Sequence, residues 1–340
     1  MMALIARLRH TPSPPSVPAP PFPSSPPYNA PSFLQIPSPM GAYSAVHPSV
    51  VDMGPGRRWR GYRHWMAFTP YDNTDDDNEN PCIVASHDGW TWVVPAGLTN
   101  PIYPAPLNGL LFNSDTDLVY DPDTDEMILV YRAQERDPYK SQRWFYARTY
   151  DGVTYPPVAT RFDLPRPDRV QFGPGQLLSP SMVRVASGAW RAFTIYRDVT
   201  PMQLQVWEAP SVEATWYKVA DLTGFEALLE AGANPWHLDV IHDGSAYRML
   251  LDLGPNYLAK PDGLVAASSL NGVSWNVNLT PVMMPSPSGW DSVELYRSTL
   301  APHENGTHFR VWYSAQGTVG AIWHTGYTEI PRSLWPDPPA

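Results

Sequence analysis

The chain has 340 residues, a net charge of −10 at pH 7, 16% charged residues and one cysteine. An acidic chain is poorly suited to phosphate contacts, so we expect no nucleic-acid partner. The lone Cys82 excludes an intrachain disulfide framework and a cysteine-based zinc site, and no run of about 18 apolar residues is present to span a membrane.

The first 40 residues are predicted to form an extended, proline-rich arm. Residues 11–40 hold 12 of the 41 prolines, mixed with serine and alanine. Such a segment builds no core of its own and acts as a semi-rigid spacer. It is either a disordered tail or a tether that docks on neighbouring subunits, with the apolar residues 1–8 as its anchor. The first ten residues are too short, and too basic at their end, for a secretory signal.

Residues 41–332 repeat one strand-rich pattern at a spacing of about sixty residues. A tight-turn dipeptide followed by an aromatic residue recurs at Asp88-Gly89, Asp151-Gly152 and Asn271-Gly272, and Val212 takes the corresponding place in the third repeat. Asp-Gly and Asn-Gly favour tight turns because both residues tolerate positive φ. A period of this length predicts an array of similar β units.

The repeats can be written as five units of about four strands, over residues 47–94, 117–161, 181–220, 238–279 and 294–327. Abundant tryptophan, tyrosine and β-branched residues favour strands, and only Gly224–Ala231 suggests a short helix. We therefore expect an all-β fold, a five-bladed β-propeller; a linear solenoid is the alternative. Unit five is one strand short, so Ser32–Ile36 or the proline-rich tail 333–340 should close the ring.

The first strand of each blade should line the central channel of a propeller. Each first strand contains a pair of adjacent apolar residues on which the five strands can be aligned. One polar residue directly precedes each pair, and a second polar residue lies two positions before the first. Strand periodicity puts both sets on one face, while Arg297 should face the other way. The two sets are Ser49, Asp117, Ser181, Asp239 and Glu294, and His47, Asp115, Ser179, His237 and Ser292.

These channel residues allow several interpretations. Short polar side chains and water fill the channel of any propeller, but the same ring could bind a sugar by hydrogen bonds. Asp117, Asp239 and Glu294 could also perform acid–base chemistry on a glycosidic bond. A cation held by Asp117, Asp239 or His237 ranks lower. The acidic loop 72–79 lacks the central glycine and spacing of a calcium loop, so we expect no cofactor, with calcium as the alternative.

Aromatic residues near the beginnings of the blades could stack on sugar rings, although most of the 14 tryptophans should pack between blades. The candidates are Trp59, Tyr62, Trp65, Tyr71, Trp236, Tyr257, Trp290 and Tyr296.

Over roughly residues 45–330, the blade layout resembles the five-bladed propellers of arabinanase and β-xylosidase type glycoside hydrolases. The resemblance implies a general-base Asp on blade one, a pKa-tuning Asp and a general-acid Glu. Asp117 would correspond to the tuning residue, and Glu294 or Asp239 to the acid. The blade-one position is Ser49, so an inverting hydrolase would lack its base. This departure favours a protein that binds glycan without cleaving it.

A second set of segments is similar to propeller domains of bacteriophage tail proteins, in particular minor tail proteins of phages that infect actinobacteria. They are His47–Val50, Gly61–Tyr71, Glu79–Pro81, Ser86–Gly89 and Asn100–Ile102.

The two resemblances together predict a phage tail protein assembled in the host cytoplasm and carried in the virion. Its propeller would bind host cell-wall glycan through His47, Ser49, Asp115, Asp117, Ser181, His237, Asp239 and Glu294. Its residues 1–40 would dock on other tail subunits, and the protein would be a homo-oligomer in the virion. The alternatives are a glycoside hydrolase acting on arabinose- or xylose-containing polysaccharide, and a purely structural tail module.

Overall fold

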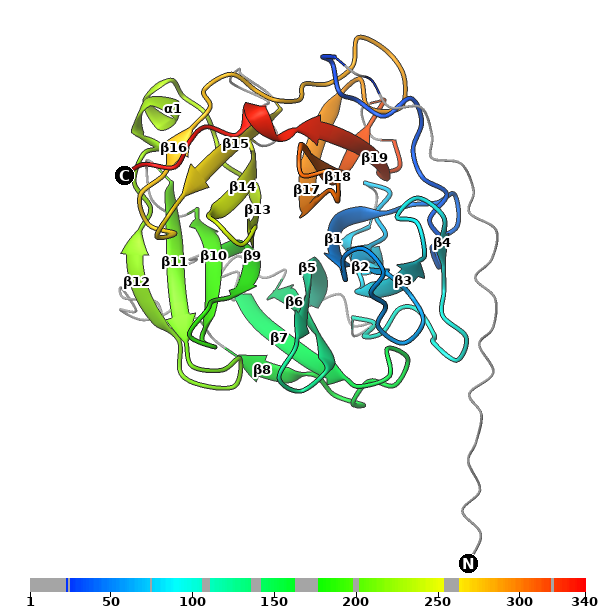
Figure 1. Cartoon of the computed structure of the whole chain (residues 1–340). Coiled ribbons are helices and arrows are strands. Elements are labelled where there is room, and N and C mark those ends of the chain that lie inside the picture. The colour runs from blue at the N-terminus through cyan, green and yellow to red at the C-terminus, as the bar shows by residue number, and fades with distance from the viewer. Residues whose placement is uncertain are drawn as a thin grey trace, which may run out of the picture.

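Five antiparallel sheets surround a central axis in the computed structural model (Figure 1), which confirms the predicted five-bladed β-propeller. The structure describes residues 23, 25–73, 75–105, 111–135, 142–162, 177–197, 202–253, 263–318 and 321–340. Most of the predicted N-terminal arm, residues 1–22 and 24, therefore lies outside the described residues. Among the described residues, no helix has the length and apolar character needed to cross a membrane.

Each blade is a meander whose first strand lies nearest the axis. Blade one contains β1 (Val46–Asp52), β2 (His64–Thr69), β3 (Cys82–Ser86) and β4 (Trp92–Val93). Blade two contains β5 (Leu111–Asp121), β6 (Glu126–Glu135), β7 (Gln142–Thr149) and β8 (Thr160–Phe162). Blade three contains β9 (Leu177–Arg184), β10 (Trp190–Tyr196), β11 (Gln203–Ala209) and β12 (Tyr217–Asp221).

Blade four contains β13 (His237–His242), β14 (Tyr247–Asp252), β15 (Leu264–Ser269) and β16 (Asn276–Val277). Blade five has three strands, β17 (Glu294–Pro302), β18 (His308–Gln316) and β19 (His324–Pro331). The short helix expected at Gly224–Ala231 is α1 (Glu226–Glu230), and two 3₁₀ turns lie at η1 (Asp76–Asn78) and η2 (Arg332–Leu334).

The repeated turn motif docks one blade against the next. In the second repeat Thr149 Oγ1 accepts a hydrogen bond from the Gly152 amide at 3.0 Å, and Gly152 has φ +81°. A Cβ at Gly152 would lie 2.3 Å from the Trp65 ring of blade one. Gly89 lies in the same way against Trp312 of blade five. The motif therefore recurs because a left-handed turn without a side chain must fit beneath an aromatic ring of the preceding blade.

The strand that unit five lacks is supplied by the N-terminal segment, which closes the seam between the two ends of the propeller. Phe33 forms an antiparallel bridge with Gly326, and the Leu34 amide donates to Thr325 O at 2.8 Å, so this segment pairs with the outer strand β19. Ile36 is fully buried beside it. The C-terminal tail instead packs on blade four, where Trp335 Nε1 donates to Met249 O at 3.1 Å.

Candidate active site

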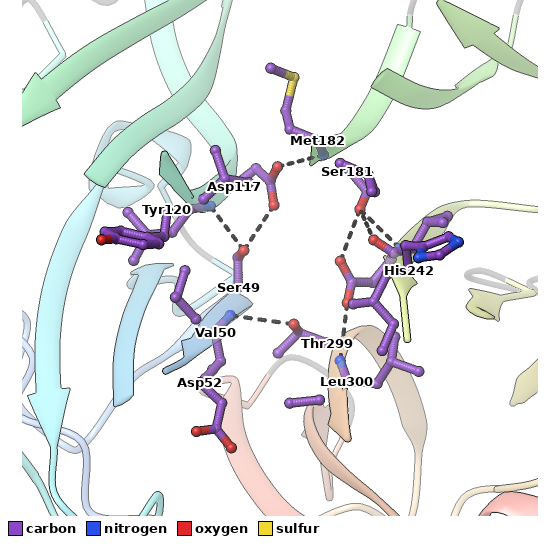
Figure 2. Close-up of a pocket in the computed structure, with 18 of the residues that line it drawn as sticks. Ser49, Val50, Asp52, Asp117, Tyr120, Ser181, Met182, His242, Thr299 and Leu300 are labelled. Carbon is purple, nitrogen blue, oxygen red and sulfur yellow. Dashed lines mark hydrogen bonds between the residues drawn. The ribbon is translucent and has the colours of Figure 1, made fainter. Parts of the chain in front are cut away.

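A ring of hydrogen bonds around the channel joins every blade to the next (Figure 2). In each blade one side chain of the first strand accepts the backbone N–H of the following blade, at 2.8 to 3.3 Å. The five acceptors are Ser49, Asp117, Ser181, Asp239 and Thr299, and the five donors are Leu118, Met182, Val240, Leu300 and Val50.

The carboxylates of this ring are fully occupied in joining blades. Asp117 also accepts from Ser49 Oγ at 2.8 Å, and Asp239 from Ser181 Oγ at 3.0 Å. Burial raises the pKa of Asp117 to about 6, despite the attraction of Arg297, and burial also raises the pKa of Asp239. The ring residues line a rear pocket, at the ends of the first strands. Ser49, Asp117, Ser181 and Asp239 thus have an evident role in closing the propeller.

Blade five enters the ring through Thr299, and Glu294 lies at the start of β17. The pairing of β17 with β18 shifts between Leu295 and Ser298, because a bulge interrupts the ladder. This bulge turns Arg297 toward the axis, contrary to the orientation expected from strand alternation. Its buried Nη2 lies 3.7 Å from Asp117 Oδ1. Glu294 Oε2 instead accepts from Gln316 Nε2 at 3.3 Å.

Bulges also shape the beginnings of the first strands in blades one, two and three. His47, Asp115 and Ser179 have φ values of 55°, 48° and 46°, in the left-handed region that non-glycine residues rarely adopt. Each such residue costs of order 1–3 kcal/mol and is characteristic of functional sites. The bulges place His47 and Asp115 in a front pocket, at the opposite end of the channel from the rear pocket.

Two imidazoles and a carboxylate converge on the floor of the front pocket. His47 Nε2 lies 3.3 Å from Asp115 Oδ1, and one ligand atom from each of His47, Asp115 and His237 lies within 4.8 Å of the others. All three residues are buried. Within the described part of the chain, His47 Nε2, His237 Nε2 and Asp115 Oδ1 have no hydrogen-bond partner. Buried polar atoms in such an arrangement call for a shared ligand.

The opposite side of each of these groups is held by the protein. Thr69 Oγ1 lies 2.8 Å from His47 Nδ1, and Ser179 Oγ hydrogen-bonds His237 Nδ1. Asp115 Oδ2 accepts the Ser179 amide at 3.2 Å and lies 3.2 Å from Arg132 Nε. Outer partners of this kind fix the orientation of metal ligands.

Electrostatics also prepares the cluster for a cation. Burial lowers the pKa of His47 to about 3 and that of His237 well below its usual value, even though Asp115 opposes both shifts. Burial acts to raise the pKa of Asp115, but Arg132 and the imidazoles outweigh it and hold that pKa low. Neutral imidazoles and an ionised carboxylate are the metal-binding forms. The donor set suits Zn²⁺, Mn²⁺ or a similar divalent ion.

Aromatic side chains form one wall of the front pocket. Trp236 Nε1 donates to Tyr296 Oη at 2.7 Å, and the Tyr296 ring lies 4.3 Å from His237 and 4.8 Å from Trp323 between centroids. The guanidinium of Arg197 lies 4.1 Å from the Trp236 ring. These contacts fix the positions of the aromatic rings that line the front pocket.

Polar and charged side chains complete the front pocket. Tyr71, Asp76 and Glu79 line it, and Glu79 Oε2 lies 3.6 Å from His47 Nδ1. The acidic loop considered for calcium thus contributes Asp76 and Glu79 to the pocket. Arg132 lines it from β6.

Seven of the eight predicted site residues therefore separate into two groups, and Glu294 belongs to neither. His47, Asp115 and His237 meet in the front pocket, whereas Ser49, Asp117, Ser181 and Asp239 form the ring. Of the aromatic candidates, Tyr71, Trp236 and Tyr296 line the front pocket, Trp59 and Trp65 pack between blades, and Tyr257 lies outside the described residues. Arg132 and Glu79 were missed because they lie outside the first strands.

Comparisons place the fold among carbohydrate-active enzymes. No family model matches the chain. The chain is 31% identical, over 316 residues, to the A type blood N-acetyl-α-D-galactosamine deacetylase of Flavonifractor plautii. The match covers 79% of the chain but only 40% of the length of that curated relative.

The solved structures that resemble this chain are also carbohydrate-active enzymes. The crystal structure of an N-acetylgalactosamine deacetylase from F. plautii, in complex with blood group B trisaccharide, has a TM-score of 0.73 at 25% identity and covers 90% of this chain and 97% of its own. An α-L-arabinofuranosidase from Lactobacillus brevis has a TM-score of 0.61 at 11% identity, with coverages of 88% and 97%. A thermostable family-43 glycoside hydrolase has a TM-score of 0.58 at 12% identity, with coverages of 91% and 100%.

The chain is a five-bladed β-propeller that resembles family-43 glycoside hydrolases of the arabinanase and β-xylosidase type. The predicted function as a phage tail protein is wrong, because the similar proteins named above are enzymes that act on glycans. The segments read as a tail-protein resemblance are parts of the blades: Gly61–Tyr71 leads into and contains β2, and Ser86–Gly89 is a blade-docking turn.

Proposed function

We propose that this protein is a metal-dependent glycan-processing hydrolase that removes the acetyl group from an N-acetylated amino sugar, with terminal N-acetylgalactosamine as the substrate class. The observation that carries the proposal is the convergence of His47, His237 and Asp115, which are buried and whose Nε2, Nε2 and Oδ1 atoms have no hydrogen-bond partners among the described residues. The similarity to the deacetylase, in sequence and in fold, supports the choice of substrate.

The arrangement favours amide hydrolysis over cleavage of a glycosidic bond. The carboxylates first considered for glycosidic chemistry, Asp117 and Asp239, hold adjacent blades together in the ring, and Glu294 contacts Gln316. A bound divalent ion would polarise the acyl oxygen and make water a better nucleophile near neutral pH. That chemistry suits an amide, whose carbonyl carbon must be attacked by water.

The chain's own residues supply orientation and proton transfer. His47, His237 and Asp115 would hold the ion, each fixed from behind by Thr69, Ser179 or Arg132. Trp236 and Tyr296 would support the sugar ring. Glu79 is the candidate general base, since it is a buried carboxylate in the same pocket, and such a group can take a proton from the attacking water.

The test uses the full chain, stripped with chelator and reloaded separately with Zn²⁺, Mn²⁺ or Co²⁺. Each form is incubated with an α-linked N-acetylgalactosaminide, and acetate, free amine and released sugar are all measured. We expect acetate and amine from at least one reloaded form and none from the stripped protein. Asp115→Asn and His237→Gln should lose bound metal and activity together, whereas Asp221→Asn, an exposed carboxylate on β12, should retain both.

Two outcomes would overturn the proposal. Release of sugar without acetate would identify a glycosidase, and arabinose- or xylose-containing polysaccharides would then be the substrates to examine. Full activity of the stripped protein, with no metal detected by elemental analysis, would rule out a metal-dependent reaction.

A further inference from the structure

Arg132 of β6 carries a buried charged nitrogen that the front pocket leaves without a partner. Its side chain is 9% exposed, and among the described residues Nη1 has no hydrogen-bond partner. Arg132 is one of the residues that line the pocket. A buried guanidinium N–H without an acceptor is costly, more so than a neutral one, so such a group in a pocket indicates an acceptor supplied from outside the chain.

The guanidinium is held firmly in place from its other edge. Arg132 Nε donates to Ser114 Oγ at 2.9 Å and lies 3.2 Å from Asp115 Oδ2. The other oxygen of the same carboxylate, Oδ1, lies 3.3 Å from His47 Nε2. Arg132 therefore contacts one oxygen of the carboxylate whose other oxygen would hold the metal. Two contacts at Nε fix a planar group, so Nη1 is a preorganised donor beside the reaction centre.

We propose that Arg132 is a catalytic residue whose Nη1 donates to the acyl oxygen as that oxygen gains negative charge. The inference rests on the proposed function. In the reaction, the water oxygen bonds to the acyl carbon and the carbonyl π electrons move to the acyl oxygen. When these electrons re-form the carbonyl, the carbon–nitrogen bond breaks and the nitrogen takes a proton that came from the water. The second water proton leaves the new carboxylic acid and is taken up by the amine, so the products are acetate and a protonated amine, and Arg132 keeps its protons throughout.

A purely positioning role is the competing explanation, in which Arg132 does no more than orient Asp115. The two roles predict different effects of the Arg132→Lys substitution. Lysine could still pair with Asp115, but its ammonium is a point charge and cannot reach the carboxylate and the acyl oxygen together as the guanidinium fork does. A positioning role also predicts that metal binding and activity fall in parallel.

The test measures kcat, KM, bound metal and acetate affinity for the Mn²⁺- and Zn²⁺-loaded full chain and for Arg132→Lys and Arg132→Ala. We expect kcat to fall by about 10²–10³, as for loss of one oxyanion donor, with KM and bound metal little changed in Arg132→Lys. Guanidinium ion added to Arg132→Ala should restore part of kcat. Arg248→Lys is the matched control, since Arg248 is also buried on a second strand with Nε bound to an aspartate.

The outcomes separate this inference from the proposed function. If the wild-type chain releases no acetate under any loading, the proposed function fails, and acetate affinity alone then decides the role of Arg132. Weaker acetate binding in both Arg132 variants, with metal retained, supports a contact between Nη1 and a substrate oxygen. Unchanged acetate binding, or loss of metal in proportion to loss of activity, overturns it.

Discussion

Replacing Arg297 with methionine should destabilise the propeller more than any surface substitution, because it removes the positive charge that attracts the buried carboxylates of Asp117 and Asp239. The Arg297 Nη2 to Asp117 Oδ1 distance of 3.7 Å corresponds to about 4 kcal/mol at an effective dielectric constant of about 20. Breaking a buried pair typically costs about 3–5 kcal/mol. We therefore expect the free energy of unfolding near pH 7.5 to fall by about 4 kcal/mol.

The pH dependence of this loss provides a second check. The pKa of Asp117 is about 6 in the folded protein, above its ordinary value of 3.8, because burial outweighs the attraction of Arg297. The folded state thus binds more protons than the unfolded state between those values, so this group's contribution to stability falls as pH rises through that window. At about pH 5 Asp117 is largely protonated in both proteins, and the difference between them should shrink.

The assay is urea denaturation of metal-free protein, followed by tryptophan fluorescence, at the two pH values. Arg60→Met, which removes an exposed arginine paired with Asp125, is the control and should cost less than about 1 kcal/mol. In an Asp117→Asn background, Arg297→Met should cost less than in the wild type. An equal loss at both pH values, or a loss below about 1 kcal/mol at the higher pH, would refute the electrostatic explanation.

Two further substitutions test how the blades dock on one another and how the N-terminal segment closes the propeller. Gly152→Ala should lower the free energy of unfolding by about 3 kcal/mol or more, because its Cβ would meet the Trp65 ring at 2.3 Å. Gly56→Ala, with φ +71° and open space around it, should lower it by only about 1 kcal/mol. Comparable thermal stabilities for the two variants would contradict the docking role. Ile36→Ala should cost about 2–5 kcal/mol because that side chain is fully buried at the seam, and chemical denaturation should show no such loss for Val158→Ala, which is 76% exposed.

The fold could be predicted from the sequence because its cause is local and repeated. The Asp-Gly turns and the aromatic residues after them recur in register with the blades, and each glycine is required by contact with the preceding blade. In blades one to four, strand alternation also placed a polar residue of the first strand near the axis. Blade five was misaligned because β17 offers two apolar pairs, Leu295-Tyr296 and Leu300-Ala301, and the structure uses the second.

The site was harder to predict because bulges and distant strands create it. Strand alternation gave His47 and Ser49 a common role, yet a left-handed φ at His47 separates them into different pockets. Arg132 comes from β6, where nothing in the local sequence marks it, and Glu79 comes from the segment after η1, where the acidic loop 72–79 indicated charge but no role in this pocket. Their importance arises only when tertiary contacts bring them to Asp115 and His47.

The inter-blade ring has a direction of rotation, since every donor amide belongs to the blade that follows its acceptor. The junction between blades five and one obeys the same rule: the Val50 amide donates to Thr299 Oγ1 at 3.3 Å. The hydrogen bond between blades five and one is thus of the same kind as the bonds between consecutive blades, although no direct chain connection joins β19 of blade five to β1 of blade one. A circular permutation that moved the chain ends to a loop between two other blades would therefore leave all five hydrogen bonds of the ring in place.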